Sequence, residues 1–380
     1  MKMKKSKIKT VLILLIIMGL CLSVGVYAGY TLSATEVTYT KSDGTTVSVK
    51  VALDELREKM TTMGVTAKSI TEAQADNMLS KVVNSPIQDA YGNKISIPAG
   101  FKITGDATTV DKGIVIIDSN GNEFVWIPTG TIYTNAQKTA SKTINLNRYT
   151  FDENGNPTGY NDTSIPHGSH KFQELATSTR GVTTAKNIED FKVKASATGN
   201  GGFYIGRYEA RTGTARSASG NALTTLTTKG SDYVYNYVTQ PQAAELARNM
   251  YKDATTFTSD LMNSYAWDTA TLFLQTCGDN STYSRKGIVS SSLATTGTNN
   301  QTTKDVQCNV YDMASNVLEW TTEEFTYYPG VLRGSSYYHA YYTSFRNADS
   351  TNTGNSSKYG FRPLLYVQYW MLKQYLNYVN

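Results

Sequence analysis

Cysteine is scarce in this 380-residue chain, which contains only Cys21, Cys277 and Cys308. Cys21 lies in an apolar N-terminal run, where we interpret it as a passive apolar residue. The other two cysteines cannot build a disulfide scaffold in a chain of this length. They lack the two-residue spacing of a redox pair. The sequence leaves open whether they form one bridge or remain buried thiols.

Charge is also scarce, since charged residues make up 18% of the chain and hydrophobic residues 40%. This balance is typical of a folded globule rather than a disordered chain. The formal net charge is +5, and five lysines among the first nine residues account for all of it. The remainder is neutral and has no general electrostatic attraction for a phosphate backbone. We therefore exclude nucleic acid as a partner.

The N-terminal lysines precede Val11 to Val26, a run without any charged residue. A basic flank followed by an apolar run is typical of an export signal, and cleavage after Ala28 fits the small residues there. Alternatively, residues 8–29 are long enough to remain as a membrane-spanning helix, with the lysines on the cytoplasmic side. We therefore expect residues 1–29 to be a signal peptide or membrane anchor, and the rest to be extracytoplasmic, either at the cell surface or secreted.

Residues 30–85 read as a stalk or attachment region. Apolar and polar residues alternate on both sides of Ser42 to Gly44, which predicts a hairpin. Helical spacing follows at Leu53 to Met60, and we expect a second helix over Glu72 to Val83. We find no chemistry in this region.

The main domain is expected over residues 86–367, with 368–380 as a C-terminal tail. Turn sequences at Asp89–Asn93, Asp118–Asn122 and Asp152–Asn156 separate apolar runs. We expect helices at Gln240 to Tyr251 and near Ser259 to Gln275. Many short strands with two helices predict an α+β domain with much irregular loop.

Several segments in order resemble one family, the formylglycine-generating enzymes and sulfatase-modifying factors, which have a C-type-lectin-like fold. The segments are Phe124–Pro128 (FVWIP), Gly202–Ala210 (GFYIGRYEA), Gln242–Leu246 (QAAEL), Tyr265–Asp268 (YAWD), Asn309–Thr321 (NVYDMASNVLEWT), Val331–Ser335 (VLRGS) and Gly360–Pro363 (GFRP). The resemblance covers about residues 95 to 367. Each segment alone is weak, whereas the ordered set with its closing Gly-Phe-Arg is specific.

The resemblance implies a calcium site, because the family binds calcium in the segment that matches Asp312 to Glu319. Carried over by position, Asp312 and Glu319 give carboxylate oxygens, and Ser315 and Val317 give main-chain carbonyls. Oxygen ligands of this kind suit calcium. The sequence departs from the family where Ser315 replaces a usual glycine and Leu318 a usual tryptophan. The alternative is that Asp312 and Glu319 only cap and pair within the loop.

The enzymes of this family oxidise a substrate cysteine with copper held by two cysteines just before the closing Gly-Phe-Arg. No cysteine follows Cys308 in this chain, and the stretch from Tyr337 to Asn347 carries tyrosines instead. His339 cannot replace two thiolates, the soft ligands that copper(I) requires. We therefore expect no copper and no formylglycine formation. We interpret His167 and His170 as a solvated pair in a polar loop.

The segment from Gly334 to Gly360 contains no Leu, Ile, Val or Met, so it is not expected to fill a core. Its tyrosines lie among serines and asparagines, as in antibody paratopes, where tyrosine offers a large contact area at low entropic cost. The candidate ligand-contacting residues are Tyr337, Tyr338, His339, Tyr341, Tyr342, Ser344, Asn347, Asp349, Ser350, Asn352 and Asn355.

One branch of the family is diversified by retroelements that mutate adenines near the C-terminal end, and this segment resembles that branch in position and composition. Arg333, Gly334, Gly360, Phe361 and Arg362 would then be the fixed frame. The alternative is an ordinary polar loop in a tyrosine-rich chain.

These observations favour a non-enzymatic, surface-displayed protein that binds an unknown protein or glycan ligand. Two other classes stay open at this point. One is an enzyme of the wider family with cysteine oxidation or a related chemistry, and the other is a structural cell-surface protein.

Overall fold

The computed structural model describes residues 38–40, 46–48, 68–75, 84–161, 163–175, 181–196, 201–290, 292–298 and 305–367. The chain divides into two compact units, Met1–Ala67 with Met371–Asn380 and Lys68–Trp370. In the first unit, β1 (Thr38–Thr40) pairs antiparallel with β2 (Thr46–Ser48), which confirms the predicted hairpin. The expected leader, the helix at 53–60 and the C-terminal tail lie outside the described residues. No described helix is long and apolar enough to cross a membrane.

The second unit begins at Lys68, earlier than the boundary near Pro86 that the sequence suggested. Strand β3 (Lys68–Ser69) pairs parallel with β4 (Ser85–Gln88), and α3 (Ile70–Ala75) follows it. Ile70 and Ala73 are buried in the main core. The end of the expected stalk is therefore part of the main unit. The helix expected over 72–83 is described only as far as Ala75.

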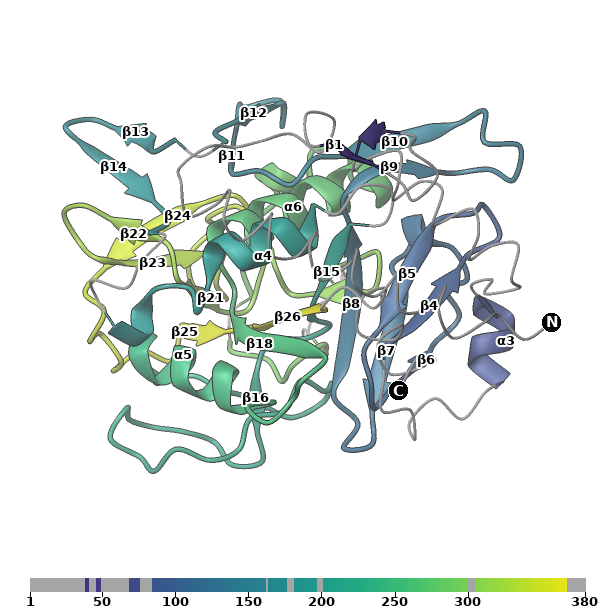
Figure 1. The fold of residues 1–380 in the computed structure, drawn as a ribbon. Helices are drawn as coiled ribbons and strands as arrows, with labels where there is room; N and C mark the ends of the chain where they lie inside the picture. Colours follow the sequence, from purple (N-terminus) through teal and green to yellow (C-terminus); the bar gives the residue numbers. More distant parts are fainter. Residues whose placement is uncertain are drawn as a thin grey trace. The chain divides into compact units, whose positions relative to one another are not determined.

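A six-stranded antiparallel sheet forms the centre of this unit, in the order β18-β26-β15-β8-β7-β6 (Figure 1). Its strands are β6 (Phe101–Thr104), β7 (Val115–Asp118), β8 (Glu123–Pro128), β15 (Gly202–Gly206), β18 (Phe257–Leu261) and β26 (Pro363–Val367). All five residues of β15 are buried. A Cβ at Gly202 would lie 2.2 Å from the Trp126 ring, so glycine is needed where that ring packs.

Three hairpin turns share the sequence Asp-x-x-Gly-Asn and one hydrogen-bond pattern. At Asp118, one carboxylate oxygen accepts from the main-chain N–H groups of Asn120 and Asn122, at 2.9 and 2.8 Å. The other accepts from the Asn122 amide at 2.8 Å. The same bonds recur at Asp89 and Asp152. They confirm the predicted turns between β4 and β5 (Lys94–Ile97), β7 and β8, and β11 (Tyr149–Phe151) and β12 (Pro157–Gly159).

Three longer helices pack around the sheets: α4 (Ile188–Ala195), α5 (Gln240–Asn249) and α6 (Ser264–Cys277). Helix α5 confirms the prediction and begins with a capping box between Thr239 and Gln242. The second expected helix is wrong at its start, because Ser259 to Leu261 belong to β18. The helix begins only after Asn263, whose side chain accepts from the Ala266 N–H. The sequence did not predict α4.

A four-stranded sheet in the order β24-β23-β21-β25 carries three of the seven segments singled out in the sequence. Its strands are β21 (Leu318–Thr321), β23 (Gly330–Arg333), β24 (Arg346–Asp349) and β25 (Tyr359–Phe361). Trp320, Leu332 and Phe361 bury their side chains in one cluster behind it. Since β25 leads through Arg362 into β26, this sheet is continuous in the chain with the larger one.

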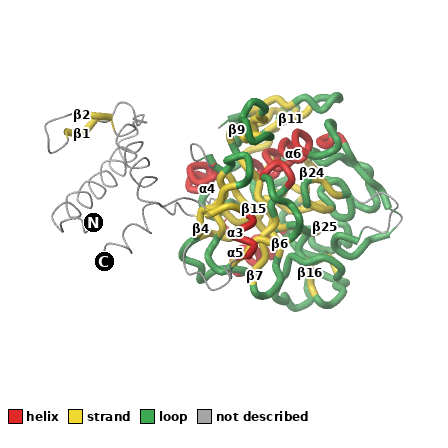
Figure 2. Tube along the Cα trace, turned by 90° about the vertical axis from the view of Figure 1, so that its right-hand side faces the viewer, coloured by secondary structure: helices red, strands yellow, loops and turns green. Residues whose placement is uncertain are grey.

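The remaining strands form small sheets, and loops fill much of the unit (Figure 2). They are β9 (Gly130–Tyr133) with β10 (Ser141–Ile144), β13 (Ile165–His167) with β14 (His170–Gln173) and β22 (Glu324–Phe325), β16 (Arg211–Thr212) with β17 (Tyr233–Val234), and β19 (Val306–Gln307) with β20 (Val310–Tyr311). Short 3-10 turns occur at η2 (Val110–Lys112), η3 (Gly181–Thr183) and η4 (Tyr283–Arg285). The described residues are thus mixed α+β, mostly strands with few helices, as predicted.

Candidate binding face

The segment 335–359 runs from the end of β23 through the edge strand β24 to the start of β25. Its main chain is held by groups that lie outside the segment. Three N–H groups of the segment donate to framework carbonyls: Tyr337 to Asn316 (2.7 Å), Thr343 to Lys286 (2.9 Å) and Ser344 to Ser284 (3.0 Å). Two framework side chains donate to carbonyls of the segment: the Trp267 indole to Thr343 (2.8 Å) and Arg333 Nε to Phe345 (3.0 Å). None of these bonds uses a side chain of the segment.

The second half of the segment is held in the same way. The Gln240 and Tyr237 N–H groups donate to the carbonyls of Thr351 and Ser356, both at 3.1 Å. The Asn236 amide donates to the Ser357 carbonyl at 3.1 Å. The conformation of this irregular segment therefore depends mainly on the surrounding framework and on its own main chain. Local side-chain bonds from Ser336, Asp349 and Ser350 add to these contacts.

Gly287 allows one close approach between the framework and the segment. A Cβ at this position would lie 1.6 Å from the Tyr341 carbonyl oxygen, closer than any side chain can tolerate. The neighbouring Ile288 N–H donates to the Ala314 carbonyl at 2.7 Å, which also holds the Gly287 loop. No sequence pattern indicated the contact of Gly287 with Tyr341, because the two residues are more than fifty positions apart.

Most of the predicted contact side chains reach the surface. Tyr338 is 63% exposed. Ser350, Asn352 and Asn355 are also exposed, while Tyr337, His339, Tyr341, Tyr342, Asn347 and Asp349 are half-buried. Ser344 is the exception, being 9% exposed beneath the segment. We correct its assignment as a ligand-contacting residue. Its main chain bonds to Ser284 and Arg333, and its side chain is buried.

Aromatic rings in the first half of the segment form a continuous series of contacts, which we call the aromatic row. His339 and Phe345 stack on Tyr341, with ring centroids 5.2 and 4.1 Å away. Tyr338 packs edge-on against His339, and Tyr342 edge-on against Phe345. Offset and edge-to-face geometries are the favourable arrangements for such rings.

A cation lies over the ring at each end of the aromatic row. Lys358 Nζ is 3.7 Å from the centre of the Tyr338 ring, and the Arg285 guanidinium carbon is 3.8 Å from the centre of the Tyr342 ring. Arg285 comes from η4, so sequence reasoning about the C-terminal segment missed it.

Beneath the face lies a buried network of three arginines and two carboxylates. Glu323 pairs with Arg148 (2.6 Å), Arg333 (3.2 Å) and Arg346 (2.9 Å), while Asp268 pairs with Arg333 (2.5 Å) and Arg346. Each side chain is 7% exposed or less. Burial alone would raise the pKa of Glu323, but the three guanidinium groups hold it at about 2.

This network joins parts of the chain that are far apart in sequence. Asp268 belongs to α6, Arg333 to β23 and Arg346 to β24, while Arg148 precedes β11. Arg346 is therefore a framework residue inside the segment, with its guanidinium turned away from the surface. The sequence pointed to Arg333 as part of a fixed frame and to Asp268 as a structural acid of a family-like segment, but not to Arg148, Glu323 or Arg346.

The four predicted calcium ligands lie in the turn before β21 and at its start. Asp312 accepts hydrogen bonds from the Gly297 N–H (2.8 Å) and the Ser315 hydroxyl (3.3 Å). The Val317 N–H donates to Glu209 at 3.2 Å. Glu319 receives two bonds from Arg362, at 2.7 and 3.1 Å. The described residues contain no group of three or more His, Cys, Asp or Glu side chains placed to hold a metal ion.

Two further buried acids, Glu209 and Asp305, surround this turn. Burial and then the charge of Asp305 raise the pKa of Asp312 to about 7. Burial and the charges of Asp312 and Glu319 raise the pKa of Glu209 well above its ordinary value. Arg362 and the partly exposed Lys286, 3.7 Å from Asp305, are the cations nearby. The four acids, if all were ionised, would carry more negative charge than these two cations balance.

The two cysteines of the body are free thiols and lie outside the segment. Burial raises the pKa of Cys277 to about 12 and also raises that of Cys308. Neither thiol is therefore ionised near neutral pH, and a thiolate is the form that binds metals.

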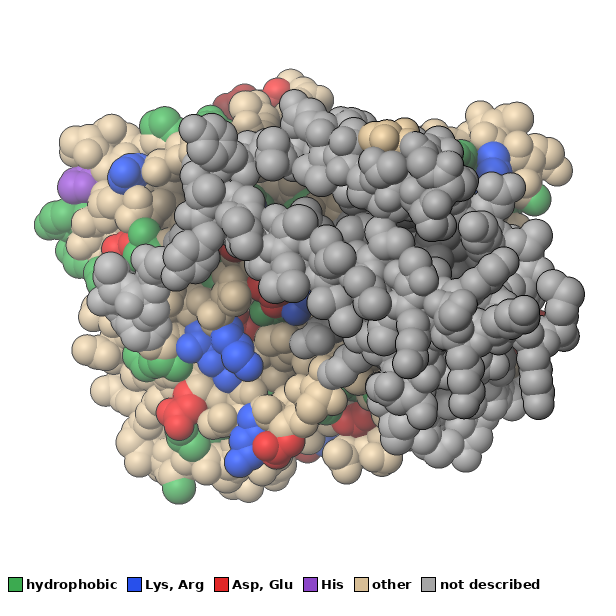
Figure 3. Space-filling view, in the orientation of Figure 1, with side chains coloured by type: hydrophobic (Ala, Val, Ile, Leu, Met, Phe, Trp, Pro, Cys, Tyr) green, Lys and Arg blue, Asp and Glu red, His purple; other side chains and the backbone are tan. Residues whose placement is uncertain are grey.

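A second aromatic patch lies on the β13–β14 hairpin and was missed by sequence reasoning. His167 and His170 both pack against Phe325, with ring centroids 5.7 and 5.5 Å away, and His170 also contacts Tyr327. Tyr327 and Tyr328 are 60% and 49% exposed. A histidine and hydrophobic side chains gather at this edge in Figure 3. His167 is exposed and His170 half-buried, so the pair reaches solvent as expected, but it lies on a hairpin and contacts an aromatic cluster.

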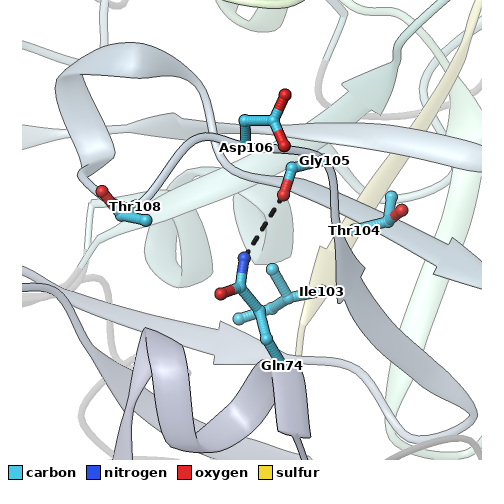
Figure 4. A pocket seen from close by; sticks show the side chains of 6 residues that line it. All are labelled: Gln74, Ile103, Thr104, Gly105, Asp106 and Thr108. Carbon is cyan, nitrogen blue, oxygen red and sulfur yellow. Dashed lines mark hydrogen bonds between the residues drawn. The ribbon is translucent and has the colours of Figure 1, made fainter.

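An open depression of about 450 Å³ lies between α3 and the end of β6. Gln74 reaches across it to the Gly105 carbonyl at 3.3 Å, and Asp106 is its one charged lining residue (Figure 4). A single exposed carboxylate gives this depression no catalytic pair and no ligand set.

No family model, curated protein or solved structure matches this chain.

Glu323→Gln tests the buried network. Removing one partner leaves buried guanidinium groups uncompensated, so we expect the free energy of unfolding to fall by about 3–5 kcal/mol. The measurement is urea denaturation followed by tryptophan fluorescence. Glu153→Gln, at an exposed acid in a turn, is the control and should change stability by less than about 0.5 kcal/mol. Equal, small effects of both variants would contradict this role of Glu323.

Proposed function

We propose that this chain is a non-enzymatic, ligand-binding protein displayed outside the cytoplasm, with residues 335–359 as its binding face. One observation carries the proposal. The main chain of the segment is held by framework groups such as Asn316, Lys286 and Trp267, while its tyrosine, histidine and asparagine side chains reach the surface. A surface built in this way keeps its shape when its side chains change.

The scaffold that we propose is the C-type-lectin-like fold of the formylglycine-generating family. The placement of the similar segments supports this. FVWIP and GFYIG form the adjacent strands β8 and β15. The segments that contain Glu319, Arg333 and Gly360 form the adjacent strands β21, β23 and β25. Segments distant in sequence thus meet in two sheets, as parts of one conserved architecture would.

Recognition rather than copper chemistry is supported by the thiols that the body does contain. Cys277 and Cys308 lie outside the segment where the family places its copper ligands, and burial raises the pKa of both thiols. The aromatic row takes the place of a thiolate pair.

We also propose diversification of this face by a retroelement. Tyr338 has an exposed side chain, and tyrosine is one of the types reached by mutating adenines in an asparagine codon. The exposed Asn352 and Asn355 would be positions at which that codon is unchanged. A near-copy of the coding segment beside a reverse-transcriptase gene would support the proposal.

Calcium bound at Asp312 and Glu319, with the Ser315 and Val317 carbonyls, is a separate proposal. The excess of buried carboxylates fits a cation, and oxygen donors suit calcium. Since Glu319 is also bound by Arg362, calcium would share that carboxylate with the guanidinium. Such a cation would stabilise the turn that supports Tyr337 through the Asn316 carbonyl.

Tyr337→Ala combined with Tyr341→Ala tests the binding face. We expect the affinity of the full chain for any ligand found on an array of glycans and extracellular proteins to fall by at least about tenfold, because buried tyrosine contacts dominate such interfaces. Circular dichroism should show retained folding. Tyr233→Ala, at an exposed tyrosine on β17, is the control. Unchanged binding by the double variant would exclude this face.

The pH dependence of stability tests the calcium proposal. Asp312 and Glu209 have raised pKa values, so the folded chain holds protons that the unfolded chain has released. Without calcium, the stability that these protonated acids contribute is therefore present at pH 5. It is lost as the pH rises through about 7. We expect the melting temperature in EDTA to be at least about 2 °C lower at pH 8 than at pH 5.5.

Calcium favours the ionised carboxylates, so it should restore the melting temperature at pH 8 and have little effect at pH 5.5. Asp312→Asn should abolish the calcium response, whereas Asp106→Asn, at an exposed acid, should retain it. No calcium response at pH 8 in the unsubstituted chain would overturn the calcium proposal.

A further inference from the structure

The charges at the ends of the aromatic row are not balanced within the face. Neither Lys358 nor Arg285 forms an ion pair with a residue that the structure describes. The acid within the segment, Asp349, is already bound by the Tyr359 hydroxyl (2.9 Å) and the Thr353 hydroxyl (2.9 Å). Positive charge therefore marks both ends of the row, on a body whose charges, these two cations included, sum to zero.

The geometry leaves both cations able to bind an anion. The Arg285 guanidinium covers one face of Tyr342 at 3.8 Å, and a stacked guanidinium can still direct its N–H groups outward to carboxylate or phosphate oxygens. Lys358 is a half-buried point charge above the exposed Tyr338. Between them, the exposed Tyr338 and the outer edges of the half-buried rings offer apolar contact to the C–H groups of a sugar ring.

We propose, on the basis of the binding function above, that the ligand of this face is an anionic polysaccharide that lies along the aromatic row from Lys358 to Arg285. A charged sugar polymer presents a flat C–H face and an acidic group in each repeat, which matches rings flanked by cations. An acidic peptide matches less well. The row lies in the irregular stretch 335–345 rather than on an edge strand, so it offers no strand pairing to a peptide main chain.

Affinity electrophoresis of the full chain tests this proposal. Native gels contain polygalacturonate, dextran sulfate, neutral dextran or polyglutamate. We expect retardation by the two anionic polysaccharides, weakening as salt is raised, and none by neutral dextran. Polyglutamate should retard the chain much less. Retardation by polyglutamate equal to that by polygalacturonate would overturn the assignment to a polysaccharide, and retardation by neutral dextran would overturn the need for anionic groups.

Charge variants locate the site. Lys358→Gln and Arg285→Gln should each weaken binding to polygalacturonate by about fivefold, the effect of losing roughly 1 kcal/mol of charge interaction. Lys102→Gln removes an exposed lysine from β6 and should have no effect. If all three variants bind alike, the polysaccharide does not lie along the row.

A Tyr338→Ala variant separates this proposal from the one on which it rests. If Tyr338→Ala abolishes binding to a ligand while Lys358→Gln and Arg285→Gln do not, the face binds but its ligand is not anionic. If none of these variants alters the binding of a ligand, the binding face itself is wrongly placed.

Discussion

The buried ion network of Asp268 and Glu323 with three arginines is the interaction on which the rest of this structure depends. It contains three positive and two negative groups in a region that water does not reach. Buried ions are costly unless each is paired, so the network fixes the relative positions of the elements that supply them. Helix α6, strand β23 and strand β24 are thereby held in one arrangement.

That arrangement is what makes an irregular surface segment well defined. Arg333 not only pairs with the two acids but also donates to the Phe345 and Ser344 carbonyls. The Trp267 indole, from the same helix as Asp268, bonds to the Thr343 carbonyl. The framework thus positions the main chain of the segment, and the aromatic row with its two cations is carried on it. A rigid main chain with varied polar and aromatic side chains is the physical basis of the proposed binding function.

Sequence patterns predicted local features well and long-range ones poorly. The Asp-x-x-Gly-Asn turns and the start of helix α5 were predicted because their signals lie within a few neighbouring residues. The helix expected from Ser259 began too early, since pairing of β18 with β26, a contact across a hundred residues, decides that stretch. The candidate face was found from composition alone. Arg285 and the burial of Ser344 could not be found, because both depend on a loop sixty residues away.

The central claim is that the main chain of 335–359 does not depend on the side chains of Tyr338, Asn352 and Asn355. A comprehensive substitution scan of this segment in the displayed full chain, with protease resistance as the readout, tests it most directly. The account predicts that nearly all replacements at Tyr338, Asn352 and Asn355 remain resistant, whereas replacements at Arg346 do not. Equal sensitivity at Arg346 and at the exposed positions would contradict it.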